Sequence, residues 1–136
     1  MIDAQAALQK AIIATTRAST PVKAVLGDPP RVYDRSPQEP TAPYATFGPM
    51  QSIDAGDQCH EGVEVYVELN VWSEAVGMQE AQAGAAALMA ELDAALTVEG
   101  FEIIIHACEG AVTNRDPDGL TIRSRLTFRY VLAPTA

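Results

Sequence analysis

The sequence predicts a single α+β domain in which a four-stranded, mostly antiparallel sheet has helices packed on one face. Three observations predict it. Residues 63–73 alternate apolar with mixed side chains, which is typical of a half-buried strand. An alanine-rich helical pattern follows at once, and two later stretches rich in β-branched residues read as further strands. Strands joined by short turns pair antiparallel, so the helices should cover one side.

The N-terminal third is expected to be helical and then extended. Asp3 is a suitable N-cap for a helix over residues 4–16, and Thr20-Pro21 restarts a short helix that ends before Gly27. Prolines make residues 28–43 a surface connector that offers Val32-Tyr33 as a short edge strand. Neither side of the connector has enough apolar residues to fold well alone, so we expect one domain over residues 1–136.

The middle of the chain is expected to form two strands around a polar segment. A strand begins at residues 44–47, and Gly48-Pro49 interrupts it. Residues 48–62 are polar and contain three glycines, so we expect a hairpin tip or a mobile arm there. The strand over residues 63–73 then places its valines and one leucine on the core face and ends its outward face at Trp72.

The C-terminal half is expected to add one helix and two strands. Apolar residues at helical spacing predict a helix over residues 78–96, with small residues that would let another surface approach: Ala83, Gly84, Ala86 and Ala87. A strand over residues 101–107 follows, and Asp116-Pro117-Asp118-Gly119 predicts a turn. The last strand, residues 120–132, has its apolar residues on one face, beginning with Leu120, and its arginines on the other: Arg123, Arg125 and Arg129.

Composition and charge exclude several classes of function. The formal charge of −9 argues against binding nucleic acid over a broad face, which needs a basic footprint. No apolar run is long enough to cross a bilayer, and the first residues do not resemble a secretory signal, so we expect a cytoplasmic protein. Two cysteines in a reducing compartment should be free thiols. No nucleophile elbow or phosphate-binding loop is present, so we expect neither an enzyme nor a cofactor.

A metal site is the sharpest alternative. Cys59-His60 and the pair His106 and Cys108 together supply the ligand types of a structural zinc, if the two pairs lie on neighbouring strands. Zinc ligands usually come as closely spaced knuckles on tight turns, and neither pair has that spacing. Two ordinary histidines and two free thiols are therefore the expected interpretation.

The arginines of the last strand and the outward aromatic residues are candidates for an interface. The arginines either pair across the sheet with Glu64 and Glu68 or meet an acidic surface of a partner. An exposed Trp72 is typical of an interface anchor, whereas we expect the N-terminal helix to cover Tyr66. Asp54 and Asp57 lie in the polar segment, which is either disordered or ordered by a partner.

Several short motifs follow one another along the chain: Val32-Tyr33-Asp34, Pro43-Tyr44, Val71-Trp72-Ser73, Gly77, the turn from Arg115 to Thr121, and Leu126-Thr127-Phe128-Arg129. Their order resembles the phage tail completion family, which includes tail terminator proteins of long-tailed phages and gene transfer agents. The resemblance spans nearly the whole chain. Each motif alone occurs in many folds, but their order and spacing are more specific. The length and polarity of residues 48–62 depart from the pattern.

The resemblance implies a structural protein without catalytic residues. Such proteins assemble as a six-membered ring on the last ring of tail-tube subunits, stop tube polymerisation and offer a docking face for the head. The implied partners are further copies of the chain, the major tail tube protein and a head-completion or connector protein. DNA only passes through the ring, and no membrane is involved. The implied location is the host cytoplasm during assembly and then the neck of the tail.

The candidate interface residues are Trp72, Arg123, Arg125, Arg129, Asp54 and Asp57. A closed ring needs a contact between two different patches of one subunit, and the basic strand face and an acidic edge are the candidate pair. The alternatives are a small monomeric or dimeric metal- or ligand-binding module and another head-completion protein of the same particle.

Overall fold

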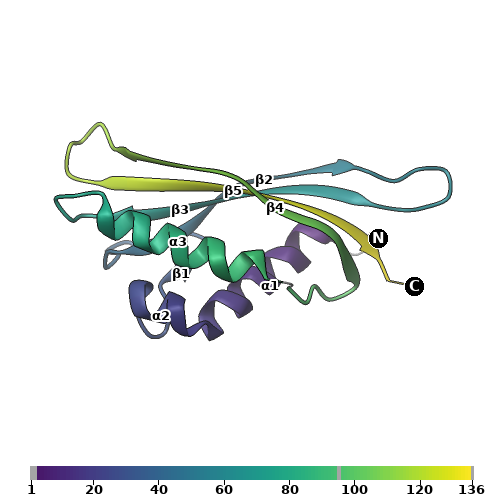
Figure 1. The fold of residues 1–136 in the computed structure, drawn as a ribbon, viewed down its shortest axis with the longest axis horizontal. Helices are drawn as coiled ribbons and strands as arrows, with labels where there is room; N and C mark the ends of the chain where they lie inside the picture. Colours follow the sequence, from purple (N-terminus) through teal and green to yellow (C-terminus); the bar gives the residue numbers. More distant parts are fainter. Residues whose placement is uncertain (1–2, 95, 136) are drawn as a thin grey trace.

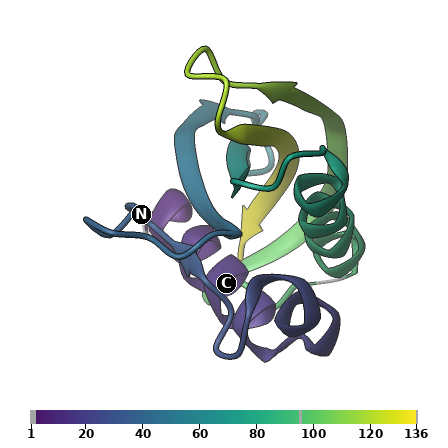
Figure 2. The ribbon, with the colours of Figure 1, turned by 90° about the vertical axis from the view of Figure 1, so that its left-hand side faces the viewer.

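The computed structural model describes residues 3–94 and 96–135. Within these residues the chain forms one mixed sheet of five strands and three helices (Figures 1 and 2). In chain order the elements are α1 (Ala4–Ala18), α2 (Thr20–Leu26), β1 (Val32–Tyr33), β2 (Tyr44–Asp54), β3 (Val63–Ser73), α3 (Gln79–Asp93), β4 (Phe101–Arg115) and β5 (Ile122–Pro134). The α+β class is confirmed.

The sheet has the strand order β1-β2-β3-β5-β4, and the prediction of four strands is wrong by one. The fifth strand is β1, which pairs in parallel with β2, whereas all other neighbouring strands are antiparallel. The Ala45 N–H donates to the Arg31 carbonyl at 2.8 Å. The parallel direction arises because the connector after β1 turns the chain back before β2 begins.

The helices bury their apolar stripes against one face of the sheet. Asp3 caps α1 as predicted, since its side chain accepts a hydrogen bond from the Ala6 N–H at 3.2 Å. Leu8 and Ile12 of α1 and Leu88 of α3 are fully buried against the strands. The core face of β3 also matches the prediction, with these side chains fully buried: Val65, Val67, Leu69 and Val71.

The third helix is shorter than the sequence predicts. It ends at Asp93, because Ala94 has an extended backbone. Leu96 is buried, but it belongs to the connection after the helix. Residue 95 lies outside the described residues. Gly84 packs directly on the sheet, and a Cβ built there would lie 2.8 Å from Val71 Cγ1. At this position the small residue lets the protein's own strand, not an outside surface, come close.

The last two strands form one long hairpin. β4 runs on to Arg115, well past the predicted end at residue 107, and β5 begins at Ile122. Leu120, predicted to begin the last strand on its apolar face, precedes β5 and is 76% exposed, so that prediction is wrong. The Asp118 carboxylate accepts hydrogen bonds from the N–H groups of Leu120 and Thr121, which keeps Leu120 in the turn and outside the sheet.

The two hairpins end at opposite ends of the molecule (Figure 1). The β4–β5 turn lies at the left in this view and the β2–β3 tip at the right. β2 continues past Gly48-Pro49 by means of a bulge between Phe47 and Met50, because residues 50–54 pair with residues 63–67 of β3. Residues 48–54 of the polar segment are therefore the second half of β2, and residues 55–62 are the tip of the arm that β2 forms with β3.

Candidate interaction surfaces

In the part of the chain that the structure describes, one face of the sheet has no helix over it. We call this the outer sheet face, the side opposite α1 and α3. Alternate residues of a strand point to opposite faces, so the partners of the buried valines point outward. Cross-strand register places Tyr66 beside Arg129, Asn70 beside Arg125, and Trp72 beside Arg123. The structure thus brings together the four predicted interface residues of β3 and β5 on one face.

Arg129 is less exposed than Arg125 and is paired within the domain. Its Nε donates to Glu64 Oε2 at 2.7 Å, and the two side chains are 28% and 20% exposed. Glu109 of β4 lies 4.0 Å away on the other side. The hydrogen bond to Glu64 raises the pKa of Arg129 above its ordinary value. The pairing across the sheet that the sequence suggested is therefore present here.

Arg125 is more accessible. Its side chain is 46% exposed, and its Nε lies 4.0 Å from Glu68 Oε1, at the limit of an ion pair. Glu68 also accepts a hydrogen bond from Asn70 Nδ2 at 3.1 Å. Because the carboxylate is shared and the guanidinium is open, Arg125 is the arginine of this face best placed to meet a partner.

Trp72 and Arg123 are in contact at the end of the outer sheet face where β1 pairs with β2. The Arg123 guanidinium lies 5.5 Å from the centre of the Trp72 ring, within the range of a cation–π contact. Trp72 Nε1 donates to Thr46 Oγ1 at 3.0 Å. Trp72 is half-buried. The expectation that the N-terminal helix covers Tyr66 is wrong, because α1 packs on the opposite face.

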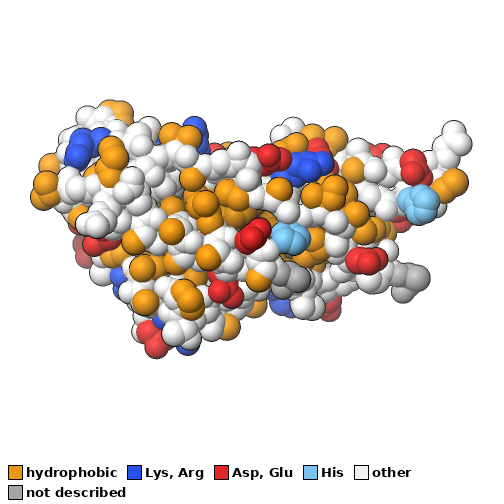
Figure 3. Space-filling model, in the orientation of Figure 1, with side chains coloured by type: hydrophobic (Ala, Val, Ile, Leu, Met, Phe, Trp, Pro, Cys, Tyr) orange, Lys and Arg blue, Asp and Glu red, His pale blue; other side chains and the backbone are white. Residues whose placement is uncertain are grey.

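The two predicted acids of the arm shape its tip. Asp54 Oδ1 accepts from the Gly56 N–H at 2.9 Å. Asp57 Oδ1 accepts from the N–H groups of Cys59 and His60 at 2.8 and 2.7 Å. The bond from Cys59, then those from His60, hold the pKa of Asp57 below 3.8. Acidic side chains and a histidine are visible at this end of the molecule (Figure 3).

The zinc alternative does not match the topology. Cys59 and His60 lie at the arm tip, whereas His106 and Cys108 lie on β4, which pairs with β5. The two pairs are therefore not on neighbouring strands. Among the described residues, no group of three or more His, Cys, Asp or Glu side chains is placed to hold a metal ion.

Several exposed apolar side chains were not found from the sequence. Ile53 on β2 is 43% exposed, and Ile105 on β4 is 42% exposed. Both lie on strands that we expected to be half-buried or polar. A local pattern does not tell an edge strand from a central one, since the difference depends on which strand lies next to it.

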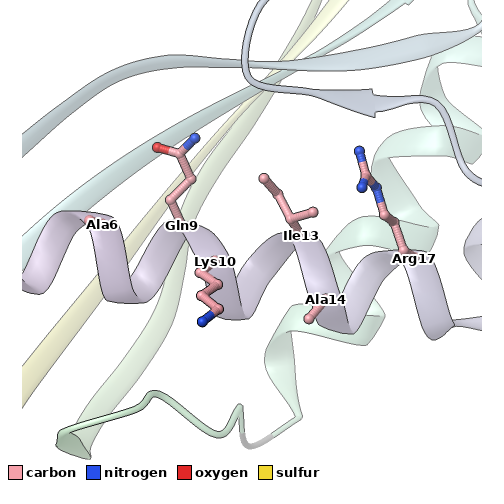
Figure 4. Close-up of a pocket in the computed structure, with 6 residues that line it drawn as sticks. All are labelled: Ala6, Gln9, Lys10, Ile13, Ala14 and Arg17. Carbon is pink, nitrogen blue, oxygen red and sulfur yellow. The ribbon is translucent and has the colours of Figure 1, made fainter.

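A shallow groove runs along α1 (Figure 4). Its volume is about 520 Å³, and its lining comes from a single helix: Ala6, Gln9, Lys10, Ile13, Ala14 and Arg17. Gln9, Ile13 and Arg17 point to the same side in the close-up. Arg17 Nη2 donates to the Val32 carbonyl of β1 at 3.3 Å, which places this side beside the β1 end of the sheet. A single-helix groove lacks the enclosing walls of a small-molecule pocket.

Comparisons with known proteins identify the family. The family model for tail completion protein gp17 matches residues 10–133. The chain belongs to this family. A chain in the virion of a native gene transfer agent particle is 28% identical, with a TM-score of 0.87, and the alignment covers 98% of this chain and 99% of that one. The gp17 protein of bacteriophage SPP1 has the same fold, with 21% identity, a TM-score of 0.61 and coverage of 93% and 89%.

The family membership defines the class of function. The chain is a structural tail completion protein of a phage-type particle, and it is not an enzyme. No curated protein matches its sequence significantly. Within the described residues, none of the helices has the length and apolar character needed to span a membrane.

Proposed function

We propose that this tail completion protein is a tail terminator. It forms a ring, with six copies as the expected number, on the last ring of tail-tube subunits. The ring stops polymerisation of the tube and offers the surface to which the head-completion or connector protein docks. DNA passes through the ring without specific binding. Assembly takes place in the bacterial host, and the ring remains in the neck of the particle.

The match over almost the whole length of a chain from an assembled particle is the observation that carries this proposal. The architecture is consistent with a part that works through its surfaces. Among residues 3–94 and 96–135, no helix covers the outer sheet face, and the two hairpins extend in opposite directions (Figure 1). A subunit with partners above, below and on both sides needs several such surfaces.

Within the ring we assign partner contacts to the outer sheet face and the arm. Arg123, Arg125 and Trp72 present a basic and aromatic surface, and Arg129 supports it through Glu64. Asp54 and Asp57 mark the arm that reaches toward a neighbouring protein. The formal charge of −9 gives the rest of the surface an acidic character, which suits contacts between basic and acidic patches.

Charge reversal of Arg125 tests this assignment. Because Arg125 is 46% exposed and only 4.0 Å from its carboxylate, Arg125→Glu should leave the fold intact and weaken assembly at low salt. Arg129→Glu is a poorer test, since it would break a close pair inside the domain. Assembly of the Arg125→Glu protein at wild-type concentrations in low salt would remove this residue from the interface.

Native mass spectrometry over a range of concentrations tests the ring. A metal-free hexamer, or a hexamer that appears only with tube ends, is the expected result. A monomer that carries stoichiometric zinc and does not bind tubes would contradict the proposal. A chain that binds the head connector and never the tube would instead be a head-completion protein.

A further inference from the structure

Both edges of the sheet have backbone groups that no strand of the described chain pairs with. β4 pairs with β5 alone along its 15 residues. On the other side of the sheet, β1 covers β2 only at Ala45 and Thr46, so residues 50–54 form a second open edge. Long open edges are templates for pairing with another chain.

The two open edges have compatible directions. Each of the pairs β2–β3, β3–β5 and β5–β4 is antiparallel, so β2 and β4 run in opposite directions. A second copy rotated about an axis along the strands would therefore place its β2 antiparallel to β4 of the first. Such a contact joins two different patches. It closes into a ring when the rotation angle between neighbouring copies is a whole fraction of 360°.

One irregularity of each edge lies in the same row of the sheet. The bulge at residues 48–49 stands opposite Glu68 of β3, and the bulge at residues 109–110 stands opposite Thr127 of β5. Glu68 and Thr127 are themselves partners, so both bulges lie in the same row across the sheet. A bulge normally disturbs pairing by one residue. Because each edge has one extra residue in this row, the two edges of adjacent copies stay in step across it. β4 has a second bulge at Ile104 that β2 does not match, so the regular part of its edge begins at Ile105.

An exposed isoleucine lies on each edge in one common row. Ile53 pairs with Glu64, Glu64 with Val131, and Val131 with Ile105. Ile53 is 43% exposed and Ile105 is 42% exposed. In a ring without a rise along its axis, Ile105 of one copy would lie beside Ile53 of the next, and each would cover the other.

The helices beside these edges have opposite charges. Gln5 Nε2 of α1 donates to Ser52 Oγ of β2 at 2.9 Å, and Asp93 of α3 lies 4.0 Å from His106 of β4. Pairing of the edges would therefore bring α3 of one copy to α1 of the next. α1 has basic residues and no acidic ones, whereas α3 has acidic residues and no basic ones: Lys10 and Arg17 against Glu80, Glu91 and Asp93. Lys10 and Arg17 both line the groove along α1 (Figure 4).

We propose that neighbouring copies join by antiparallel pairing of residues 105–108 of β4 with residues 50–53 of β2 in the next copy. The sheet then continues from subunit to subunit around the ring, with α3 against the next α1. This inference rests on the proposed function for the existence of the ring, but it specifies a contact and a register that the ring alone does not require.

Paired cysteines test the register. In a Cys59→Ser/Cys108→Ser background, which removes both native thiols, Ile53→Cys/Ile105→Cys should form a ladder of disulfide-linked oligomers on mild oxidation of assembled rings. Either single substitution should stay monomeric on a non-reducing gel, because the two residues come from different patches. Ile53→Cys/Val112→Cys is the matched control. Val112 lies on β4, as Ile105 does, and is 52% exposed, but it is in the same row of the sheet as Thr46, far from Ile53. This control should not form the ladder.

The outcomes separate this contact from the proposed function. Rings seen by electron microscopy without cross-linking of Ile53→Cys/Ile105→Cys would overturn the contact and leave the terminator role standing. Cross-linking of a single variant would also overturn it, because that result indicates a two-fold dimer. If neither the purified protein nor tail ends show a ring, the proposed function fails together with the contact.

A charge placed on the edge gives an independent measurement. Ile105→Lys should retain the wild-type circular dichroism spectrum and raise the concentration needed for ring formation at least tenfold. Leu120→Lys is the control, because Leu120 is as large as isoleucine, is more exposed than Ile105 and lies outside both edges. It should assemble like the wild type. Rings of Ile105→Lys at wild-type concentrations would overturn the proposal.

Discussion

Replacement of Gly84 by alanine tests how closely α3 packs on the sheet. The new Cβ would lie 2.8 Å from Val71 Cγ1 and 3.5 Å from Leu26 Cδ2. The first distance is too short for two carbon atoms, so either the helix or the valine must move. Val71 is fully buried in a central strand, and its β-branched side chain has little rotamer freedom. We therefore expect strain that the site cannot relieve by a simple rotation.

Two opposing terms determine the size of the effect. Overpacking of a close-packed core costs about 1–3 kcal/mol. Alanine in place of glycine within a helix gains about 1 kcal/mol. The free energy of unfolding should therefore fall by roughly 0–2 kcal/mol, the difference between these two terms. Ala83→Gly on the exposed side of α3 measures the helix term alone, and we expect it to cost about 1 kcal/mol.

Urea denaturation of the variants measures these values. The overpacking account also predicts coupling: Val71→Ala makes room, so Gly84→Ala should cost less in that background, by about 0.5–3 kcal/mol. If Gly84→Ala instead stabilised the protein by as much as Ala83→Gly destabilised it, and showed no coupling to Val71, the close contact between α3 and β3 would be refuted.

Three further predictions concern the core, the tryptophan and the second turn. Leu88→Ala should cost about 2–5 kcal/mol in urea denaturation and Leu120→Ala almost nothing, since the first side chain is fully buried and the second is 76% exposed; equal costs would contradict the assigned core. Thr46→Val should cost about 0.5–1.5 kcal/mol and change the fluorescence of Trp72, the single tryptophan, because it removes the acceptor of the indole N–H; an unchanged spectrum would argue against that bond. Backbone donation, first from Leu120, holds the pKa of Asp118 below 3.8. A carboxylate with a depressed pKa stabilises the fold when the pH is above the ordinary pKa of that group. The difference in unfolding free energy between the wild type and Asp118→Asn should therefore be complete above pH 3.8 and be lost as the pH falls below it. A difference that grew on acidification would contradict this prediction.

Local patterns in the sequence predicted the elements that local physics determines. The alternation of residues 63–73 placed the valines of β3 in the core and Trp72 outside, and Asp3 caps its helix as expected. The period-two pattern of β5 also placed Arg125 and Arg129 on the outer sheet face, diagonal to the glutamates of β3. In each case the side chain's direction follows from its position along a single element.

The remaining features depend on contacts between distant parts of the chain. The parallel pairing of Val32 with Ala45 depends on the path of the connector between them, which has no repeating pattern. The exposure of Ile105 results from the edge position of β4, and no residue of that strand signals it. Leu120 fits the apolar period of the last strand, but the hydrogen bonds of Asp118 retain it in the turn. Pairing and turn chemistry override the local pattern at these positions.

Tail-tube polymerisation in the presence of the purified chain tests the central claim most directly. Tube protein would be polymerised with and without the chain, and tube lengths and ends would be recorded by electron microscopy. The terminator account predicts that elongation stops when the chain is added and that a ring is visible at one end of each stopped tube. Tubes that continue to elongate at the same rate, with bare ends, would contradict it.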